Sequence, residues 1–379
     1  MKTILLLFGL LCTAASAQTT WIVDPNGGGN FTDLAPAIAA ASPDDTLLVR
    51  AGTYVGPYTL DKPLHIVGDG PQLPLIDRIF RPSSAGAELA SFRNLKIGRL
   101  QFYAAAVLEG VFADTVVVST GATASLHSCT LGRGATPFGS VNSEAALMIQ
   151  AASVAVSGST IRGNPGRALS INCFLLAGDT VWMNGGALSI EESVIEGSDS
   201  NQVSGCPGWT PAGSGLVIYA GTVRLTRSSV RGGFDQNNLQ TEAVWLDTPA
   251  VLRRDASVTF TPSTSLGSLV VYPATLADGA PPGGSITCTV GSDPNLPAVL
   301  VAGLGLRAPV STAFGPAWLD PTANVILRIG FTDSAGVLSA TISLPATAPT
   351  NLPLTFQGLV VPTGSTDLAL GAPAIVQVL

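Results

Sequence analysis

Charge is scarce in this 379-residue chain, and so are several residue types that common chemistries require. Only 11% of the residues are charged, and 18 basic residues stand against 25 acidic ones, for a net charge of −7. A net negative chain is a poor match for the phosphate backbone, so we expect no nucleic-acid partner. The only histidines are His65 and His127, and no cysteine pair has CxxC spacing, so we expect no metal site of the structural zinc type.

Long apolar runs are also missing beyond the N-terminus, although 46% of the residues are hydrophobic. No stretch there reaches the roughly 18 residues that a membrane-spanning helix needs. The apolar residues come in short alternating bursts, interrupted by 42 glycines and 27 prolines. Frequent glycine and proline between short apolar segments are typical of many short strands joined by turns, and this pattern predicts an all-β protein.

The N-terminus has the pattern of a secretory signal peptide over residues 1–17. Lys2 supplies a positive charge, residues 4–11 form an apolar run, and the small residues 15–17 suit signal cleavage before Gln18. We therefore expect export to the extracellular space or cell surface, with no transmembrane segment after cleavage.

Residues 21–71 read as a strand, a glycine turn, a short amphipathic helix and further short strands. The helix is predicted over 33–42, with Asp33 or Thr32 as its N-cap. One apolar face is expected from Leu34, Ala37, Ile38 and Ala41.

Four short motifs follow one another in this region: GNF (29–31), DTLLV (45–49), AGTY (51–54) and KPLHIVGDG (62–70). Their order resembles the opening of secreted right-handed parallel β-helix proteins of the pectin lyase-like superfamily. It is also similar to the opening of pectin methylesterases and of a domain that precedes many bacterial β-helices. The resemblance implies a right-handed parallel β-helix with an N-terminal capping helix, and it implies fold more than activity.

The middle of the chain repeats one pattern in segments 126–133, 156–163, 190–197 and 225–232. Their second apolar residues, 30, 34 and 35 residues apart, are Leu131, Ile161, Ile195 and Val230. A second strand is predicted in each unit, at 168–171, 187–190, 215–218 and 243–246. One such unit cannot bury its apolar face alone, whereas stacked rungs make a continuous core.

The repeat fades from about Pro262, and alternating strands with turns follow. This part is similar to a C-terminal β domain common on secreted bacterial proteins. We therefore predict a β-helix with its cap over 18–261 and a small β-sandwich-like domain over 262–379. Whether that domain caps the solenoid or packs on a partner is left open.

Long loops that follow the same strand in successive rungs should stack on one flank of the solenoid. Their aromatic and amide side chains suit a sugar surface, and the candidates are Phe138, Trp209, Phe234, Asn201 and Asn237. Asp199 and Asp235, 36 residues apart, are candidates for a catalytic pair or a shared calcium ion. The plainer interpretation is that these polar loops are simply solvated, and that Trp182, Trp245 and Trp318 belong to the core.

The cysteines of an exported protein can form disulfides. Cys129 occupies a small-residue position that serine fills in the other rungs, so a buried thiol is predicted there. Cys173 and Cys206 lie about one rung apart and are predicted to form a disulfide, while Cys288 stays unassigned.

Two functions remain open. The first is a secreted, non-catalytic β-helix protein that is structural or binds a polysaccharide or cell-surface glycan. The alternative is a polysaccharide-active enzyme, a lyase, hydrolase or esterase of the pectin lyase-like kind. The catalytic motifs of pectate lyases, polygalacturonase-like hydrolases and pectin methylesterases are missing as sequence strings, which favours the first. No cofactor is expected, and a calcium requirement is left open.

Overall fold

The computed structural model describes residues 18–85, 89–133, 144–164, 178–199, 212–235, 237–264, 268–269, 273–304, 310–312, 315–319, 324–350, 352–361 and 369–378. Within these residues the chain is almost entirely β. A parallel sheet of 22 strands is followed by antiparallel sheets of three, four and two strands. The predicted fold class, a parallel β-helix followed by an antiparallel β domain, is confirmed.

Each rung of the solenoid contributes to three faces, which we call the first, second and third face. The first face is formed by β4 (Tyr58–Thr59), the later halves of β6 (Leu75–Arg81), β8 (Lys96–Phe102) and β10 (Phe112–Val118), the early halves of β13 (Leu147–Ser157), β15 (Val181–Glu191) and β17 (Leu216–Thr226), and β19 (Val244–Leu246). A short 3-10 helix, η1 (Ser83–Ala85), follows β6.

The second face runs from the first strand to the last strand of the parallel sheet. It is formed by β1 (Thr20–Val23), β2 (Thr46–Arg50), β5 (His65–Asp69), β7 (Ala90–Arg93), β9 (Ala106–Glu109), β11 (Thr123–His127), the later halves of β13, β15 and β17, β20 (Val251–Arg254) and β22 (Ser268–Leu269).

The third face is formed by β3 (Thr53–Tyr54), the early halves of β6, β8 and β10, and then β12 (Thr130–Gly132), β14 (Thr160–Arg162), β16 (Val194–Glu196), β18 (Ser229–Arg231) and β21 (Thr259–Thr261). Leu131, Ile161, Ile195 and Val230 pair in register along it and are buried. The stacking predicted from their spacing is therefore confirmed.

The predicted second strand was partly misaligned. Residues 215–218 and 243–246 do stack on each other, in the first face. Residues 187–190 instead lie in the second face, beside 222–225, and the first-face partner of 216–218 is 181–183. The strand β15 spans two faces, with a bend at Gly185 and Gly186. A short repeated sequence motif does not reveal which half of such a strand it occupies.

A corner of two residues joins the second face to the third in six successive rungs. The first residue of each corner has positive φ, and these residues are Asn94, Gly110, Ser128, Gly158, Glu192 and Arg227. The next residue carries a ladder of hydrogen bonds: Ser159 Oγ accepts from the N–H of Cys129 at 3.0 Å, and Ser193 Oγ accepts from Ser159 N–H at 3.1 Å. Ser228 continues it by accepting from Ser193 N–H at 3.1 Å.

Cys129 takes the place of a serine in this ladder, as predicted. Its side chain is buried and the thiol is free. Burial raises the pKa of the thiol to about 12, and the thiol donates to the backbone carbonyl of His127 at 3.3 Å. The residue therefore acts as a structural, unreactive thiol.

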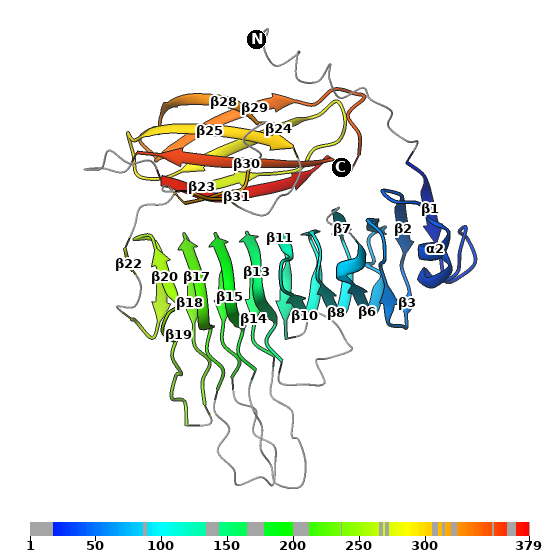
Figure 1. Ribbon diagram of the computed structural model, residues 1–379, viewed down its shortest axis with the longest axis horizontal. Helices are drawn as coiled ribbons and strands as arrows, with labels where there is room; N and C mark the ends of the chain where they lie inside the picture. Colours follow the sequence, from blue (N-terminus) through cyan, green and yellow to red (C-terminus); the bar gives the residue numbers. More distant parts are fainter. Residues whose placement is uncertain are drawn as a thin grey trace.

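The predicted cap helix is α2 (Leu34–Ala40). Asp33 is its N-cap, and the carboxylate accepts from the N–H of Leu34 at 2.8 Å. Leu34, Ala37 and Ile38 are buried in the same core cluster as the rungs. The helix lies at the N-terminal end of the solenoid in Figure 1 and shields the first rung from water.

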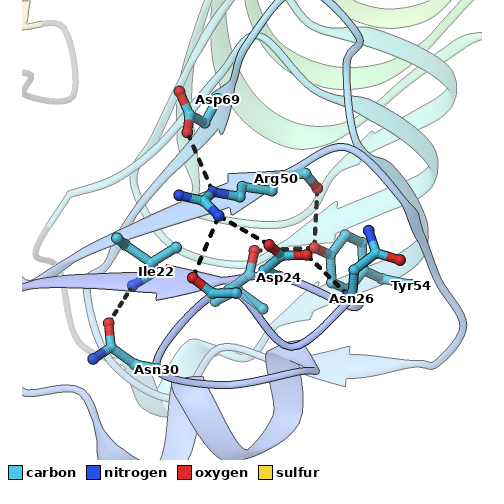
Figure 2. A network of polar contacts seen from close by, with 9 residues as sticks. Ile22, Asp24, Asn26, Asn30, Arg50, Tyr54 and Asp69 are labelled. Carbon is cyan, nitrogen blue, oxygen red and sulfur yellow. Dashed lines mark hydrogen bonds and ion pairs between the residues drawn. The ribbon is translucent and has the colours of Figure 1, made fainter.

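A polar network beside the cap explains much of the N-terminal motif pattern (Figure 2). The guanidinium of Arg50 binds the carboxylate of Asp24 at 2.9 Å. The hydroxyl of Tyr54 lies 3.1 Å from the carbonyl of Val23 and 3.0 Å from that of Arg50. The backbone N–H of Asn26 and then Arg50 lower the pKa of Asp24. The motif residue Tyr54 and the neighbouring Asp24 and Arg50 thus hold the first turns of the solenoid together.

The C-terminal domain is a β-sandwich. One sheet contains β23 (Ala274–Ala277), β24 (Ser285–Gly291) and β29 (Val337–Ser343), and the other contains β28 (Asn324–Phe331), β25 (Pro297–Leu304), β30 (Pro353–Val360) and β31 (Ala369–Gln377). A two-stranded ribbon is formed by β26 (Val310–Thr312) and β27 (Gly315–Ala317). Buried residues of both sheets, among them Val290, Leu300 and Phe356, share one core.

This domain lies lengthwise along the solenoid (Figure 1), and β31 contacts β11, β13 and β15 of the second face. Val107 and Ala155 of the solenoid form a buried apolar cluster with Trp318 and Ile375. The prediction that Trp318 is buried is confirmed. The domain therefore covers the outward side of the second face and leaves the first face on another side of the solenoid.

Candidate functional site

A row of three aromatic side chains crosses the outer surface of the first face. The ring centroids of Trp182 and Tyr219 lie 5.6 Å apart, and those of Tyr219 and Trp245 lie 4.9 Å apart. The ring planes are tilted by 51° and 57°. The three residues come from β15, β17 and β19, which are successive rungs, and we call them the aromatic row.

Strand alternation turns the two tryptophans outward. Val181 and Met183 are fully buried, so Trp182 between them points to the other side of the sheet. Trp245 follows the buried Val244 in the same way and lies in register with Val217, which in turn pairs with Trp182. The outward position is thus repeated from rung to rung.

Tyr219 reaches the row through an irregularity in strand pairing. Met183 pairs with Ile218 and Asn184 pairs with Ala220, so Tyr219 is an extra residue between two paired positions. An extra residue of this kind re-aims its side chain. The ring of Tyr219 consequently packs between the two tryptophans, beside Val217.

The aromatic row keeps a large contact surface. Tyr219 is 40% exposed and Trp245 is 37% exposed, while Trp182 is half-buried. Asn184 and Asp247, each two residues after a tryptophan of the row, are exposed. Exposed ring faces bordered by amide and carboxylate groups can stack on a sugar and hydrogen-bond to its hydroxyls.

Less exposed apolar residues continue the outward position toward the N-terminus. Met148 lies in register beside Trp182 and is half-buried. Two rungs earlier, Phe80 and Tyr103 form an edge-on pair at 5.9 Å, and the amide of Gln101 donates to the Tyr103 hydroxyl at 3.2 Å. The first face therefore has a mixed aromatic and amide surface over much of its length.

The predicted loop candidates that the structure describes are held by the backbone. Asp199 Oδ1 accepts from the N–H of Phe234 at 2.9 Å. Asp235 Oδ1 accepts from the N–H groups of Asn237 and Leu239, both at 2.8 Å. Phe234 is half-buried, Asn237 is exposed, and the two aspartates come from neighbouring rungs. Asp199 thus links two neighbouring rungs and Asp235 stabilises a turn, and a catalytic role for either stays a prediction.

The other predicted site residues, Phe138, Asn201, Trp209, Cys173 and Cys206, lie outside the described residues. The loop aromatic cluster and the disulfide therefore stay predictions. Within the described part of the chain, no group of three or more His, Cys, Asp or Glu side chains is placed to hold a metal ion. No helix among the described residues is long and apolar enough to cross a membrane.

Both histidines belong to the covered second face. His65 Nδ1 lies 2.7 Å from Ser91 Oγ, and His127 Nδ1 lies 3.0 Å from Ser157 Oγ. Burial, and then the charge of Arg93, lower the pKa of His65 to about 4, so this imidazole is neutral at pH 7. Both pairs hydrogen-bond within the second face, so we assign the two histidines a structural role.

A polar cleft of about 390 Å³ opens where the last rungs meet the sandwich. The solenoid contributes Arg227, Asp255 and Ser257 to its lining, and the sandwich contributes Ser292 and Asp293. Asp255 Oδ1 accepts from the Ser257 hydroxyl at 2.7 Å, and Arg227 lies 3.2 Å from Glu192. Arg227 and Asp255 thus already have partners within the protein, and no aromatic ring is among the described residues that line the cleft.

The residues of the aromatic row are the ones that sequence reasoning assigned wrongly or did not consider. Trp182 and Trp245 were expected in the core because their sequence neighbours are apolar, and Tyr219 was not a candidate. The available signal was alternation: each tryptophan stands between two aliphatic residues of one strand, in VWM (181–183) and VWL (244–246). If the aliphatic residues face inward, the ring between them faces out.

No protein-family model matches this chain, and no curated protein is significantly similar to it. The likeness to the pectin lyase-like superfamily therefore continues to rest on the N-terminal motifs, while the parallel solenoid itself rests on the strand register.

Proposed function

We propose that this is a secreted, non-catalytic glycan-binding protein whose binding surface is the aromatic row on the first face. One observation carries the proposal: Trp182, Tyr219 and Trp245 form a contiguous, partly exposed row on three successive rungs. Large aromatic rings normally gain free energy by burial, so a row left open to water is a candidate contact surface for a ligand.

A glycan fits this surface better than a lipid or an apolar peptide. The rings are flanked by the exposed polar side chains of Asn184 and Asp247, and Gln150 lies one rung from Asn184 in register. Such a border matches ligands that present apolar ring faces together with hydroxyl groups. Because the charged neighbour is acidic, neutral polysaccharides should bind better than polyuronates.

Rung spacing sets the direction of the ligand. Adjacent parallel strands lie about 4.8 Å apart, so three rungs extend the row along the solenoid axis. An extended glycan lying parallel to that axis contacts all three rings in turn. Export, which the N-terminal pattern predicts, would bring the row to extracellular polysaccharide.

The test is binding of the mature chain to a panel of neutral and acidic polysaccharides, measured by affinity electrophoresis and by calorimetry with defined oligosaccharides. Trp245→Ala and Tyr219→Ala should each weaken binding by roughly 5- to 10-fold, from about 1 to 1.4 kcal/mol per ring. Val55→Ala is the control, because that side chain is 74% exposed near the cap and belongs to neither the aromatic row nor β28.

Binding that survives removal of both rings, or that falls equally in the Val55 variant, would show that the row is not the binding surface. The same incubations, assayed for reducing ends and unsaturated products, address the polysaccharide-active alternative. Product formation lost on Asp199→Ala or Asp235→Ala would replace this proposal by the enzymatic one.

A further inference from the structure

The most exposed aliphatic and aromatic side chains of the sandwich gather on one strand, β28. Ile326 is 56% exposed, Ile329 is 70% exposed and Phe331 is 67% exposed. Leu327 is half-buried and contacts the sandwich core from the other side. Three large apolar residues left in water on a single eight-residue strand are unusual for a surface that contacts only solvent.

The strand β28 is also an edge strand. It pairs with β25 on one side, and among the described strands no other pairs with it. It lies on the side of the sandwich away from the solenoid (Figure 1). As far as the described strands show, the outer backbone N–H and C=O groups of residues 326–331 are therefore open to another strand.

The usual features that protect an edge are weak in β28. Its sequence, NVILRIGF, contains no proline, lysine or acidic residue. Arg328 is its one charged residue, and the guanidinium donates to the carbonyl of Ser339 within the same domain. A pairing irregularity opposite Leu300 and Val301 is confined to the N-terminal half, which leaves residues 328–331 regularly paired.

We propose that β28 pairs antiparallel with β28 of a second copy of this chain across a two-fold axis, joining two sandwiches into one continuous sheet. The proposal concerns a different surface from the aromatic row and does not depend on glycan binding. A closed two-fold contact uses the same patch on both copies, as an edge strand with a self-complementary sequence allows.

Charge and side-chain matching select the register. With Ile329 on the two-fold axis, the most exposed residue of the strand meets its own copy. Arg328 then faces Gly330 rather than another Arg328, so no like charges oppose each other. Aligned in this way, an apolar pair lies at the centre of the contact and the two arginines are kept apart.

A pairing of one short strand buries little surface, so we expect a weak dimer, with a dissociation constant on the order of micromolar. Sedimentation velocity of the mature chain from about 1 to 200 µM should show a monomer–dimer equilibrium. Ile329→Lys should shift it at least about 10-fold toward monomer, because two lysines would meet at the axis. Val55→Lys is the matched control, since Val55 is 74% exposed near the cap of the solenoid.

Cross-linking tests the register independently. Ile329→Cys should give a disulfide-linked dimer on mild oxidation, whereas Val55→Cys, with the same background cysteines, should not. A wild-type chain that stays monomeric throughout this range would overturn the proposal. So would a dimer that persists in Ile329→Lys, or one that is lost equally in Val55→Lys. Circular dichroism of each variant distinguishes loss of pairing from loss of fold.

Discussion

Glu191 lies at the contact between the solenoid and the sandwich with its side chain fully buried. Neither carboxylate oxygen has a hydrogen-bond partner of ordinary geometry. Burial, and then the like charge of Glu192, raise the pKa of Glu191 well above 4.5, as does Asp255. The backbone N–H of Thr275 on β23 and the guanidinium of Arg227 lower it, but Arg227 already lies 3.2 Å from Glu192. The domain contact therefore favours the neutral carboxyl.

The sign of the pH dependence follows from this raised pKa. In the unfolded chain Glu191 titrates near its ordinary value of 4.5, whereas the folded protein keeps the proton to a higher pH. Its favourable contribution to the free energy of unfolding is complete below pH 4.5 and is lost as the pH rises toward the folded-state pKa. Over that interval one retained proton corresponds to a slope of about 1.4 kcal/mol per pH unit.

Glu191→Gln keeps the shape of the neutral side chain and removes the titration. The variant should match the wild type near pH 4.5 and become progressively more stable than it at higher pH, by about 1.4 kcal/mol per unit until the folded-state pKa is passed. Urea unfolding at a series of pH values from about 4.5 to 9 measures the difference. Glu242→Gln, which removes an exposed carboxylate from the same solenoid, is the control.

The difference between wild type and Glu191→Gln is the decisive quantity, because other groups titrate in both proteins. A difference that stays constant with pH would refute the reasoning, since it would mean that Glu191 titrates alike in the folded and unfolded chains. Limited proteolysis of the whole protein at pH 5 and pH 9 would show whether the loss of stability weakens the contact between the solenoid and the sandwich.

Two further predictions concern the corners of the solenoid. Ser193→Ala leaves the buried N–H of Ser159 without its acceptor and should lower the free energy of unfolding by about 1–3 kcal/mol. Ser193→Cys keeps a weak acceptor and should lower it by less. Equal losses in the two variants would contradict a stabilising role for this hydrogen bond. Gly186→Ala should destabilise strongly, because a Cβ would lie 2.0 Å from the carbonyl oxygen of Ala152 at a φ of +91°. Gly121→Ala, at a φ of +79° with open space around it, should cost only the backbone strain of about 1–2 kcal/mol; thermal unfolding that ranks the two in the reverse order would contradict the packing.

Much of the solenoid could be predicted from the sequence because its core obeys a simple rule. Leu131, Ile161, Ile195 and Val230 must each face inward at the same point of a rung, so their spacing is visible in the letters. The cap helix was predictable for a similar reason, since its apolar residues and the N-cap Asp33 are local signals. The lengthwise docking of the sandwich was not, because it depends on residues from distant segments, such as Val107 and Ile375.

The candidate site was less predictable than the fold. Trp182 and Trp245 have the same apolar neighbours that a core tryptophan would have, and only the direction of alternation separates the two cases. Tyr219 joins them through one extra residue in β17, and a single-residue shift leaves no trace in composition. The loop aspartates Asp199 and Asp235 looked functional because polar residues in long loops are exposed, yet their described partners are backbone amides.

The two-residue corner between the second and third faces has a consequence for how this protein can change. That corner and its hydrogen-bond ladder keep two faces in step, whereas rungs with aligned residues 30, 34 and 35 positions apart differ mainly in the connection from the third face to the first. Insertions are therefore tolerated in the connection from the third face to the first, but not in the corner between the second and third faces. Evolution could lengthen or replace the loops beside the aromatic row while the docking surface of the sandwich stayed unaltered, so ligand preference and domain architecture can vary independently.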